Sequence, residues 1–324
     1  MPLAFVTGGS GFVGGRLVGR LVADGWTVRG LARSDAAAAV VQGRGAEPVR
    51  GDLDDLHALA AGVRGADACF HAAAKVADYG AWADFRRINV DGTRNVMRAC
   101  REAGVPRAVH VGTEAVLLDG RPLVHADETH PLAFRSKAPY SRSKALAEQV
   151  VLEESRDGFE AVVVRPRFVW GRGDTTLLPV LVDSVRSGRF RWIGGGRHLT
   201  SITHVDNVVE GVVLAAAKGR PGGVYFVTDG DPVVFREFVT ELLATQGVQA
   251  PEGSVPASFA RVVAAAGETA WRVLGLRGAP PLTRFAVWVS SQECTLDDHN
   301  ARAELGYAPV VTREQGLREL REAA

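Results

Sequence analysis

The sequence lacks several features that would point to a particular partner or compartment. It has only three cysteines in 324 residues, and Cys69, Cys100 and Cys294 fit neither a metal-ligand nor a redox spacing. We expect them to be buried small hydrophobic residues in a reducing compartment, and we predict no metal site. The net charge is +1, and no basic block alternates with aromatic residues. Neither nucleic acid nor an anionic membrane is therefore the expected partner.

Long apolar segments are also missing. No uninterrupted apolar run approaches the roughly 18 to 20 residues that a bilayer-spanning helix needs, and no basic segment precedes the first apolar run. We expect no integral membrane segment, no secretory signal and a cytoplasmic location. Apolar residues make up 46% and charged residues 23% of the chain, which is typical of a globular protein.

Short apolar runs alternate with helical patterns through the first half of the chain. This order predicts crossover units and an α/β fold, a Rossmann-type doubly wound parallel sheet with helices on both faces. We predict a dinucleotide-binding domain at 1–166 and a smaller, mainly helical substrate lobe at 167–324, interleaved with the last elements of the sheet domain. The predicted strands are Leu3–Thr7, Thr27–Leu31, Ala46–Arg50, Ala68–His71, Ala108–Val111 and Ala161–Arg165, and the predicted helices are Phe12–Ala23, Leu56–Ala61, Trp82–Ala103 and one beginning near Tyr140.

Apolar residues recur at helical spacing from Val255 to Leu276, in the predicted lobe. We expect this helix to pack on the protein core, and attachment to a membrane surface is the alternative. Several lobe residues are candidates for lining an apolar pocket, although lobe core explains most of them better: Phe259, Trp271, Leu274, Phe285 and Trp288.

A glycine-rich segment lies where the first strand should turn into the first helix. Glycines there permit a tight turn and let the backbone approach a pyrophosphate, while the helix N-terminus offers free N–H groups. The spacing Gly9-x-Gly11-x-x-Gly14 matches the dinucleotide fingerprint in its required context. The predicted cofactor-binding residues of this segment are Thr7, Gly8, Ser10, Gly11, Phe12, Val13 and Gly14.

The end of the second strand bears on the choice of dinucleotide. An acidic residue there would bind the adenosine ribose and repel a 2′-phosphate, but this chain has Ala32 followed by Arg33. Because arginine pairs well with phosphate, we predict NADP(H) in preference to NAD(H).

Tyr140 and Lys144 are separated by one helical turn, so both side chains can serve one reaction centre. A cation beside a phenol favours the phenolate and lowers the phenol pKa. Such a tyrosine can exchange a proton with the oxygen of a ketone or an alcohol.

The ordered motifs resemble those of the extended short-chain dehydrogenase/reductase superfamily over nearly the whole chain. Within it, the chain is most similar to 3β-hydroxysteroid dehydrogenase-like and 2-alkyl-3-oxoalkanoate reductase-like proteins. The motifs are Thr7–Gly14, Gly51-Asp52-Leu53, His71-Ala-Ala-Ala74, Asn89-Val-x-Gly-Thr93, Val111-Gly-Thr113, Tyr140–Lys144, Arg165-Pro166, His204-Val-Asp-Asn-Val208 and Ala303–Pro309.

The resemblance implies a role for each matching residue. Tyr140 would be the general acid/base, Lys144 would lower its pKa and bind the nicotinamide ribose, and Thr113 would donate to the substrate oxygen. Cofactor contacts are implied for Asp52, Leu53, Ala72, Ala73, Tyr140, Lys144 and Pro166. A homodimer through Trp82–Ala103 and Tyr140–Glu153 is also implied.

Two departures narrow the expected reaction. Sugar-nucleotide dehydratases of this branch carry a second acidic residue where this chain has Ala115, and epimerases often carry asparagine where it has Phe168. The stretch Arg167–Trp170 suggests an apolar substrate wall, and Arg167, Arg172 and Arg284 receive no role. We predict hydride transfer between NADP(H) and a ketone or secondary alcohol on a 3-oxoacyl or sterol-like substrate. The alternatives are a sugar-nucleotide epimerase with tightly bound NAD and a non-catalytic NADP(H) sensor.

Overall fold

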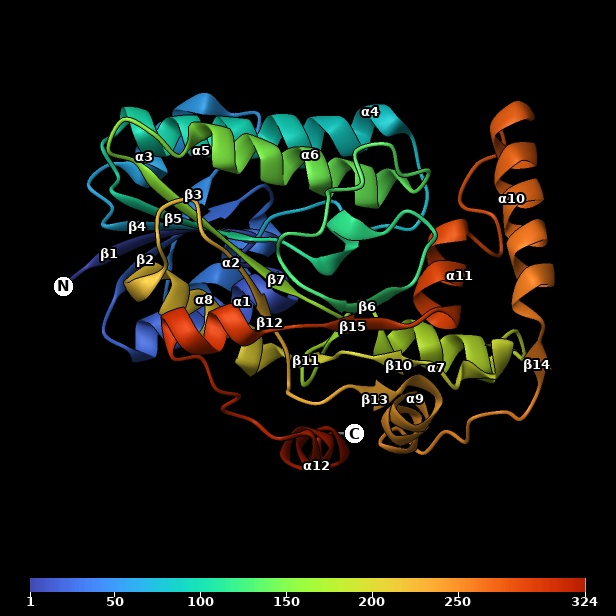
Figure 1. Cartoon of the computed structure of the whole chain (residues 1–324). Helices are drawn as coiled ribbons and strands as arrows, with labels where there is room; N and C mark the ends of the chain where they lie inside the picture. Colours follow the sequence, from blue (N-terminus) through green and yellow to red (C-terminus); the bar gives the residue numbers. More distant parts are fainter. Residues whose placement is uncertain (324) are drawn as a thin grey trace.

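A computed structural model describes residues 1–323 and confirms the predicted α/β fold (Figure 1). Seven strands form one parallel sheet in the order β12-β7-β5-β4-β1-β2-β3. Their bounds are β1 (Leu3–Thr7), β2 (Thr27–Ala32), β3 (Glu47–Arg50), β4 (Ala68–His71), β5 (Arg107–Val111), β7 (Glu160–Pro166) and β12 (Val224–Val227).

Helices cover both faces of this sheet (Figure 1). One layer contains α1 (Phe12–Ala23), α2 (Asp35–Gly43) and α8 (Val205–Lys218), and the other contains α3 (Leu56–Val63), α5 (Gly92–Glu102) and α6 (Pro139–Glu154). The predicted helix at 82–103 consists of α4 (Trp82–Phe85), a π-helical segment (Arg86–Asp91) and α5.

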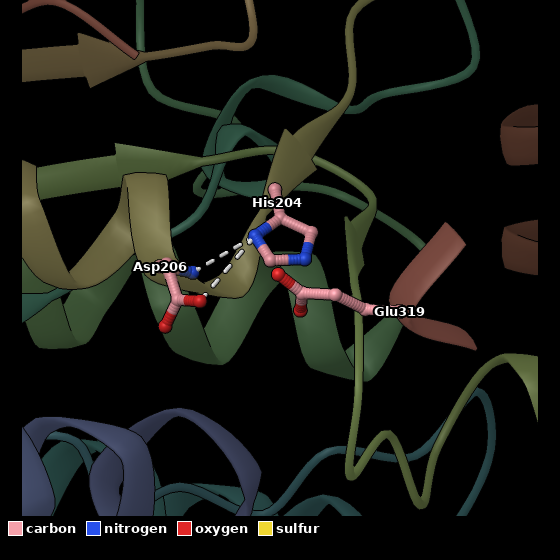
Figure 2. A group of neighbouring side chains, drawn as sticks. All are labelled: His204, Asp206 and Glu319. Atoms are coloured by element: carbon pink, nitrogen blue, oxygen red, sulfur yellow. Dashed lines mark hydrogen bonds and ion pairs between the residues drawn. The ribbon is translucent and has the colours of Figure 1, made fainter. Parts of the chain in front are cut away.

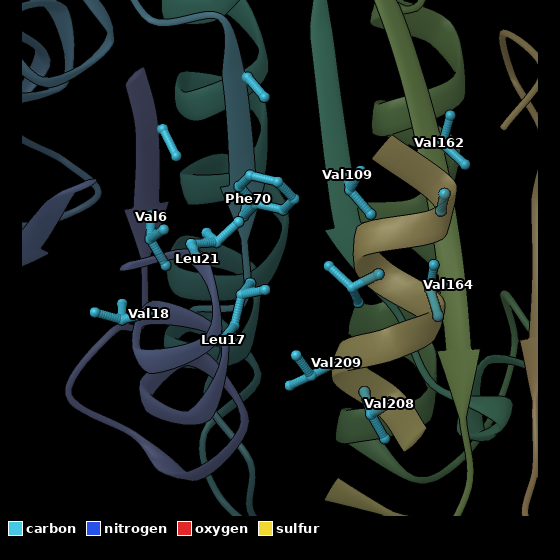
Figure 3. Close-up of a cluster of buried hydrophobic side chains, with 14 of the residues drawn as sticks. Val6, Leu17, Val18, Leu21, Phe70, Val109, Val162, Val164, Val208 and Val209 are labelled. Carbon is cyan, nitrogen blue, oxygen red and sulfur yellow. The ribbon is translucent and has the colours of Figure 1, made fainter. Parts of the chain in front are cut away.

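Strand β7 shows why the early strands have nearly continuous apolar sequences. Val162 and Val164 pack with α1 and α8 in the cluster that Figure 3 shows. Ala161 and Val163 point to the opposite face and pack with the α3, α5 and α6 layer. Both faces of the sheet are therefore buried, as is usual for parallel sheets covered by helices.

The rest of the chain builds a lobe beside the carboxyl end of β7, while α8 and β12 return to the main sheet. The lobe has a four-stranded sheet in the order β13-β10-β15-β6 and two strand pairs, β11-β8 and β14-β9. Its strands are β6 (Leu123–Ala126), β8 (Val169–Trp170), β9 (Trp192–Ile193), β10 (Leu199–Thr200), β11 (Thr203–His204), β13 (Val233–Val234), β14 (Ser254–Val255) and β15 (Cys294–Leu296). Its helices are α7 (Leu178–Arg186), α9 (Phe235–Ala244), α10 (Ala257–Val273), α11 (Arg284–Ser291) and α12 (Arg313–Glu322).

The expectation that the helix at 255–276 buries its apolar residues in the core is wrong. Phe259 is 61% exposed and Leu274 is 68% exposed. α10 packs chiefly on α11 and buries small side chains, Ala260 and Ala264, in that contact. Within residues 1–323, no helix combines the length and the apolar character needed to cross a membrane.

Candidate active site

The glycine-rich loop joins β1 to α1 at the carboxyl edge of the main sheet. Gly8 has a φ of 76°, and a Cβ there would lie 2.7 Å from the backbone nitrogen of Ala73. A Cβ on Gly14 would lie 2.3 Å from the carbonyl oxygen of Gly8. Both positions need glycine because a side chain would collide with backbone. α1 begins at Phe12 after Gly11 with no side-chain cap, so its first N–H groups can receive a phosphate.

A buried chain of hydroxyl and imidazole groups ties this loop to the next strand. The Thr7 hydroxyl lies 2.7 Å from Nδ1 of His71 and accepts a hydrogen bond from the Ala73 N–H at 3.3 Å. The Thr93 hydroxyl lies 2.9 Å from the other ring nitrogen of His71. The end of β1 at Thr7 therefore lies against the segment after β4 that contains the motif residues Ala72 and Ala73. Sequence reasoning quoted His71 and Thr93 only as parts of motifs and missed this contact.

The remaining loop residues lie on opposite sides of the turn. Ser10 is exposed at its tip, whereas Val13 packs on the main core cluster.

Arg33 follows β2 and is exposed. It makes no ion pair with another residue of the described chain, 1–323. Ser34 beside it caps α2 by accepting from the Ala37 N–H at 3.2 Å. A free guanidinium beside a helix N-terminus is an arrangement that suits an anion.

The predicted adenine-side pair lies after β3. The Asp52 carboxylate accepts from the Leu53 N–H at 2.8 Å, and Leu53 is buried against Gly92. One further residue was not expected at the loop: Arg44 donates from Nη1 to the Gly9 carbonyl at 2.7 Å. No motif points to Arg44, since it follows α2 with no fixed spacing from the glycines.

The two predicted catalytic hydroxyls meet beyond the carboxyl end of β5. Tyr140 is the second residue of α6, and Thr113 caps a short 3-10 turn at 114–117. The Thr113 hydroxyl donates to a carboxylate oxygen of Glu114 at 2.7 Å, and it lies close enough to Tyr140 to lower the pKa of that phenol. From the lobe, the Phe285 ring meets the Tyr140 ring edge-on at 5.5 Å between centroids.

Glu114 belongs to a buried ion pair. Arg167 donates from Nη1 to Glu114 at 2.5 Å and from Nε to the Thr200 hydroxyl at 3.0 Å. Both side chains are less than a tenth exposed. Sequence reasoning considered Arg167 a surface charge as readily as a ligand for a substrate carboxylate, and the surface assignment is wrong. The sequence distance between Glu114 and Arg167 did not predict the pair, because the two residues follow different strands, β5 and β7, that the fold brings together.

The pKa of Tyr140 is raised above its usual value of 10.0. Burial is the largest cause and the negative charge of Glu114 adds to it, while the hydrogen bond with Thr113 acts in the opposite direction. The expected lowering by Lys144 is not found in the protein chain alone. Tyr140 is therefore a protonated phenol at neutral pH, which suits a proton donor.

Lys144 is directed beneath the site. Its ammonium lies 3.1 Å from Nε2 of His110 and donates to the Val111 carbonyl at 3.0 Å. Burial lowers the pKa of Lys144 to about 8, while the charge of Glu148 partly opposes this. Burial also lowers the pKa of His110 well below its usual value, with Lys144 adding to the effect, so its neutral ring accepts from the ammonium.

The contact between Lys144 and His110 could have been anticipated from the sequence. His71 and His110 occupy paired positions near the ends of β4 and β5, and their rings lie 5.1 Å apart. Neighbouring parallel strands bring such residues to one edge of a sheet.

At the neighbouring strand, Pro166 is the last residue of β7. Arg165 beside it donates to the buried Glu148 at 2.9 Å, and this contact fixes α6 on β7.

A cavity of about 910 Å³ lies between the 117–137 segment and the helices α10 and α11. Leu117 and Trp288 supply apolar surface, and Trp288 is 8% exposed. Thr113, Tyr140 and Lys144 do not line this cavity. Among the predicted pocket aromatics, Trp288 lines it, Phe285 contacts Tyr140 instead, and Trp271 is half-buried in α10. Basic side chains also contribute to the wall, namely Arg121, Arg135, Lys137, Arg261 and Arg284.

The predicted apolar wall at Arg167–Trp170 does not line this cavity. Trp170 is buried in a lobe cluster with Phe238 and donates to Asp229 at 2.8 Å. Phe168 packs edge-on against Phe238 in the same region. These aromatic rings stabilise the lobe instead. Arg172 is exposed, and Arg284 is paired with Glu268 at 2.6 Å.

One other polar cluster contains His204, Asp206 and Glu319 (Figure 2). Nδ1 of His204 accepts from the Asp206 N–H at 3.3 Å and caps α8. Asp206 receives two hydrogen bonds from Arg16, at 2.5 and 2.7 Å. A guanidinium already neutralises the carboxylate that a cation would need, so this cluster joins α1 to α8 rather than forming a metal site.

Comparison with known proteins identifies the family. Residues 5–257 match the model of the 3-beta hydroxysteroid dehydrogenase/isomerase family. The chain is 52% identical over 319 residues to a 4-hydroxy-2-methyl-3-oxo-4-farnesyl-3,4-dihydroquinoline-1-oxide ketoreductase from Stigmatella aurantiaca, covering 98% of this chain and 96% of that protein. It is 38% identical to a 2-alkyl-3-oxoalkanoate reductase from Stenotrophomonas maltophilia, covering 98% of each.

A solved structure has the same fold as this chain. A dTDP-glucose 4,6-dehydratase from Streptomyces venezuelae, solved with NAD bound, matches with a TM-score of 0.77 and 26% identity over 99% of this chain and 96% of that one. The chain belongs to the 3-beta hydroxysteroid dehydrogenase/isomerase family. It is an NAD(P)-dependent oxidoreductase that interconverts a ketone and an alcohol, which confirms the resemblance drawn from its motifs.

Proposed function

We propose that this enzyme reduces a ketone on an apolar, alkyl- or farnesyl-bearing substrate, with Tyr140 as the proton donor and NADP(H) as the preferred cofactor. The observation that carries the proposal is the pair of hydroxyls of Tyr140 and Thr113, placed beside Phe285 at the end of the main sheet. The names of the relatives support an apolar ketone, because they describe a farnesylated quinoline and an alkyl oxoalkanoate.

A nicotinamide dinucleotide, when bound, would supply or accept the hydride, and the side chains of this protein handle the proton. The raised pKa of Tyr140 keeps its phenol protonated until the carbonyl oxygen gains negative charge. The Thr113 hydroxyl can turn its hydrogen from Glu114 to the same oxygen, while Arg167 holds the Glu114 carboxylate in place. Lys144, with its pKa of about 8, keeps a positive charge at neutral pH beneath the site.

Replacing Tyr140 with phenylalanine tests this assignment. Tyr140→Phe should lower kcat by roughly 10²- to 10⁴-fold, the usual contribution of general acid catalysis, and should leave dinucleotide affinity unchanged. A suitable control is Tyr225→Phe on β12, away from the site. It removes a hydroxyl that donates to Glu304 at 2.6 Å and should retain activity. Near-normal ketone reduction by Tyr140→Phe, measured as NADPH oxidation, would show that another group donates the proton.

The cofactor preference rests on the free guanidinium of Arg33 beside the N-terminus of α2. Arg33→Ala should raise KM for NADPH by roughly 10- to 100-fold, because a hydrogen bond to a charged group contributes roughly 1.5–3 kcal/mol, with little change for NADH. Arg189→Ala, an exposed lobe change, is the matched control. A wild-type enzyme that prefers NADH would overturn the proposal.

We also propose a homodimer through 82–103 and 140–153 and a cytoplasmic location. Figure 1 shows α4, α5 and α6 side by side along one outer face of the molecule. Cys69 and Cys100 are buried free thiols in the same core cluster, which suits a reducing compartment. Light scattering after size exclusion would test the dimer, and a monomer at all concentrations would refute it.

A further inference from the structure

Arg44 follows α2, and its side chain reaches the glycine-rich loop that joins β1 to α1. Its backbone is held where α2 ends, because Gly45 has a φ of 84°. The Gly45 N–H donates to the Gln42 carbonyl at 2.9 Å, and the Ala46 N–H donates to the Val41 carbonyl at 3.3 Å. This pair of hydrogen bonds is a common way to end a helix with a glycine. The glycine after Arg44 therefore stops α2 and fixes the Cα of the arginine.

Packing of α2 on β2 places Arg44 beside the loop. Val41 is fully buried in the main core cluster, and a Cβ on Gly30 of β2 would lie 2.6 Å from its Cγ1. A Cβ on Gly9 would lie 3.6 Å from the other γ-carbon of Val41. The last turn of α2 is thus held against both β2 and the loop. Arg44 follows Val41 by three residues, so its side chain begins close to the loop.

The guanidinium of Arg44 occupies a space that exists because residue 15 is glycine. A Cβ on Gly15 would overlap Nη1 and Cζ of Arg44. A Cβ on Gly19, one turn later in α1, would meet nothing within 4 Å. The dinucleotide fingerprint ends at Gly14, so it does not account for the glycine that follows. Gly14 lets α1 approach the backbone of the loop, and Gly15 admits the arginine.

The hydrogen bonds of Arg44 go to carbonyls of the loop. Nη1 donates to the Gly9 carbonyl at 2.7 Å and makes a longer contact with the Gly11 carbonyl at 3.4 Å. Every peptide bond of residues 1–323 is trans, and in a trans peptide the C=O and the following N–H point in opposite directions. A donor that holds these two carbonyls on one side of the loop therefore holds the N–H groups of Ser10 and Phe12 on the other side.

The two N–H groups held in this way are free to bind a phosphate. Neither the Ser10 N–H nor the Phe12 N–H makes a hydrogen bond within residues 1–323. Phe12 is the first residue of α1, and the N-terminus of a helix attracts anions through its free N–H groups and its partial positive charge. Arg44 adds a full positive charge behind the loop, and its hydrogen bonds neutralise no carboxylate.

We propose that Arg44 is a positioning residue for the dinucleotide. It holds the glycine-rich loop from behind and orients the Ser10 and Phe12 N–H groups before a pyrophosphate binds, without touching the cofactor. This role differs from the one proposed for Arg33, which lies at the other end of α2 and would bind the 2′-phosphate. The pyrophosphate is common to NADPH and NADH, so Arg44 serves both dinucleotides, whichever ketone the enzyme reduces.

Calorimetric titration of the full-length protein with each dinucleotide tests this role without turnover. Arg44→Met should raise Kd for NADPH and for NADH by a similar factor, roughly 10-fold, the size expected when a hydrogen bond from a charged group is lost. The kcat at saturating dinucleotide should change little. Arg44→Lys keeps a charged donor on a flexible stem and should bind both dinucleotides more tightly than Arg44→Met does.

A matched control is Arg29→Met on β2. Arg29 also donates to a backbone carbonyl, that of Arg64 at 2.8 Å, but this carbonyl follows α3 in the opposite helix layer. Both Kd values should therefore stay at their wild-type levels in Arg29→Met.

Gly15→Ala provides an independent test, because the new methyl group takes the place of the guanidinium. This variant should raise both Kd values as Arg44→Met does. The double variant Gly15→Ala/Arg44→Met should bind no more weakly than Arg44→Met alone, since no arginine is left to displace. Should Arg44→Met not fold, Gly15→Ala keeps the arginine in the chain and tests the same displacement.

Three results would overturn the proposal: unchanged Kd values in Arg44→Met, a loss confined to NADPH, or additive losses in the double variant. A loss confined to NADPH would make Arg44 a ligand of the 2′-phosphate. Additive losses would show that a side chain at residue 15 acts independently of the arginine. Thermal unfolding without cofactor shows which variants are folded at the titration temperature. Because titration needs no ketone, failure of this role and failure of the proposed ketone reduction remain distinguishable.

Discussion

Helices α1 and α10 carry similar apolar spacing but place it in opposite environments. In α1, Leu17, Val18 and Leu21 are at most 1% exposed and pack on the main sheet (Figure 3). In α10, the large apolar residues face solvent and small alanines face the protein. Apolar periodicity therefore shows which residues share a side of a helix, but it does not show what covers that side.

The difference follows from the neighbours of each helix in the chain. α1 connects β1 to β2, which are paired parallel strands, so the crossover must lie against their sheet. α10 is followed by α11 and connects no two strands of the main sheet. Nothing in the connectivity forces its apolar stripe inward.

The largest expected effect concerns the buried ion pair between Glu114, which follows β5, and Arg167, which begins the lobe. Arg167→Met should lower the free energy of unfolding by about 3–5 kcal/mol, because it leaves the buried Glu114 charge with the Thr113 hydroxyl but without a cation. Arg189→Met removes an exposed partner of Asp183 in the lobe and should change it by less than about 1 kcal/mol. Urea unfolding measures both. Equal losses would show that burial does not distinguish these pairs.

A pair of leucine substitutions tests the comparison of the two helices themselves. Leu17→Ala should cost about 2–5 kcal/mol of unfolding free energy, since it opens a cavity in a fully buried cluster. Leu274→Ala removes the same atoms from a side chain that is 68% exposed and should change stability by no more than about 0.5 kcal/mol. A large loss for Leu274→Ala would mean that another part of the protein covers this stripe in solution.

The main sheet could be predicted from sequence because local patterns and connectivity agree there. Strand positions such as Ala68–His71 are those observed. Contacts between distant segments could not be predicted. The Glu114–Arg167 pair and the position of Trp170 depend on how the lobe folds back on the sheet, which no local spacing encodes.

Lys144 provides a test by pH within the sheet region. Its pKa in the folded protein is about 8, below the usual 10.5, so the unfolded chain binds the proton more tightly. The resulting cost is fully present below pH 8 and is relieved as the pH rises from 8 to 10.5. At 1.36 kcal/mol per pKa unit, the cost is at most about 3 kcal/mol.

Lys144→Met should consequently be more stable than wild type at pH 7, by about 1–3 kcal/mol after its hydrogen bonds are lost. The difference should decrease between pH 8 and 10. Denaturant unfolding of both proteins at pH 7, 8.5 and 10 measures this, and subtraction cancels the titrating groups that Lys144 does not influence. A pH-independent difference would show that the charge of Lys144 carries no such cost.

Gly19→Ala in α1 should give the smallest effect of this set, and its comparison with Gly14→Ala separates cofactor binding from helix propensity. A Cβ at the exposed Gly19 would meet nothing within 4 Å, so Gly19→Ala should stabilise the protein by about 0.5–1 kcal/mol. At Gly15 the obstacle is the mobile end of Arg44, whereas at Gly14 it is the backbone oxygen of Gly8 at 2.3 Å. Gly14→Ala should therefore weaken dinucleotide binding, and Gly19→Ala should not. Thermal unfolding and NADPH titration of both variants would decide it. Equal losses of affinity would mean that α1 as a whole, rather than its first turn, governs cofactor binding.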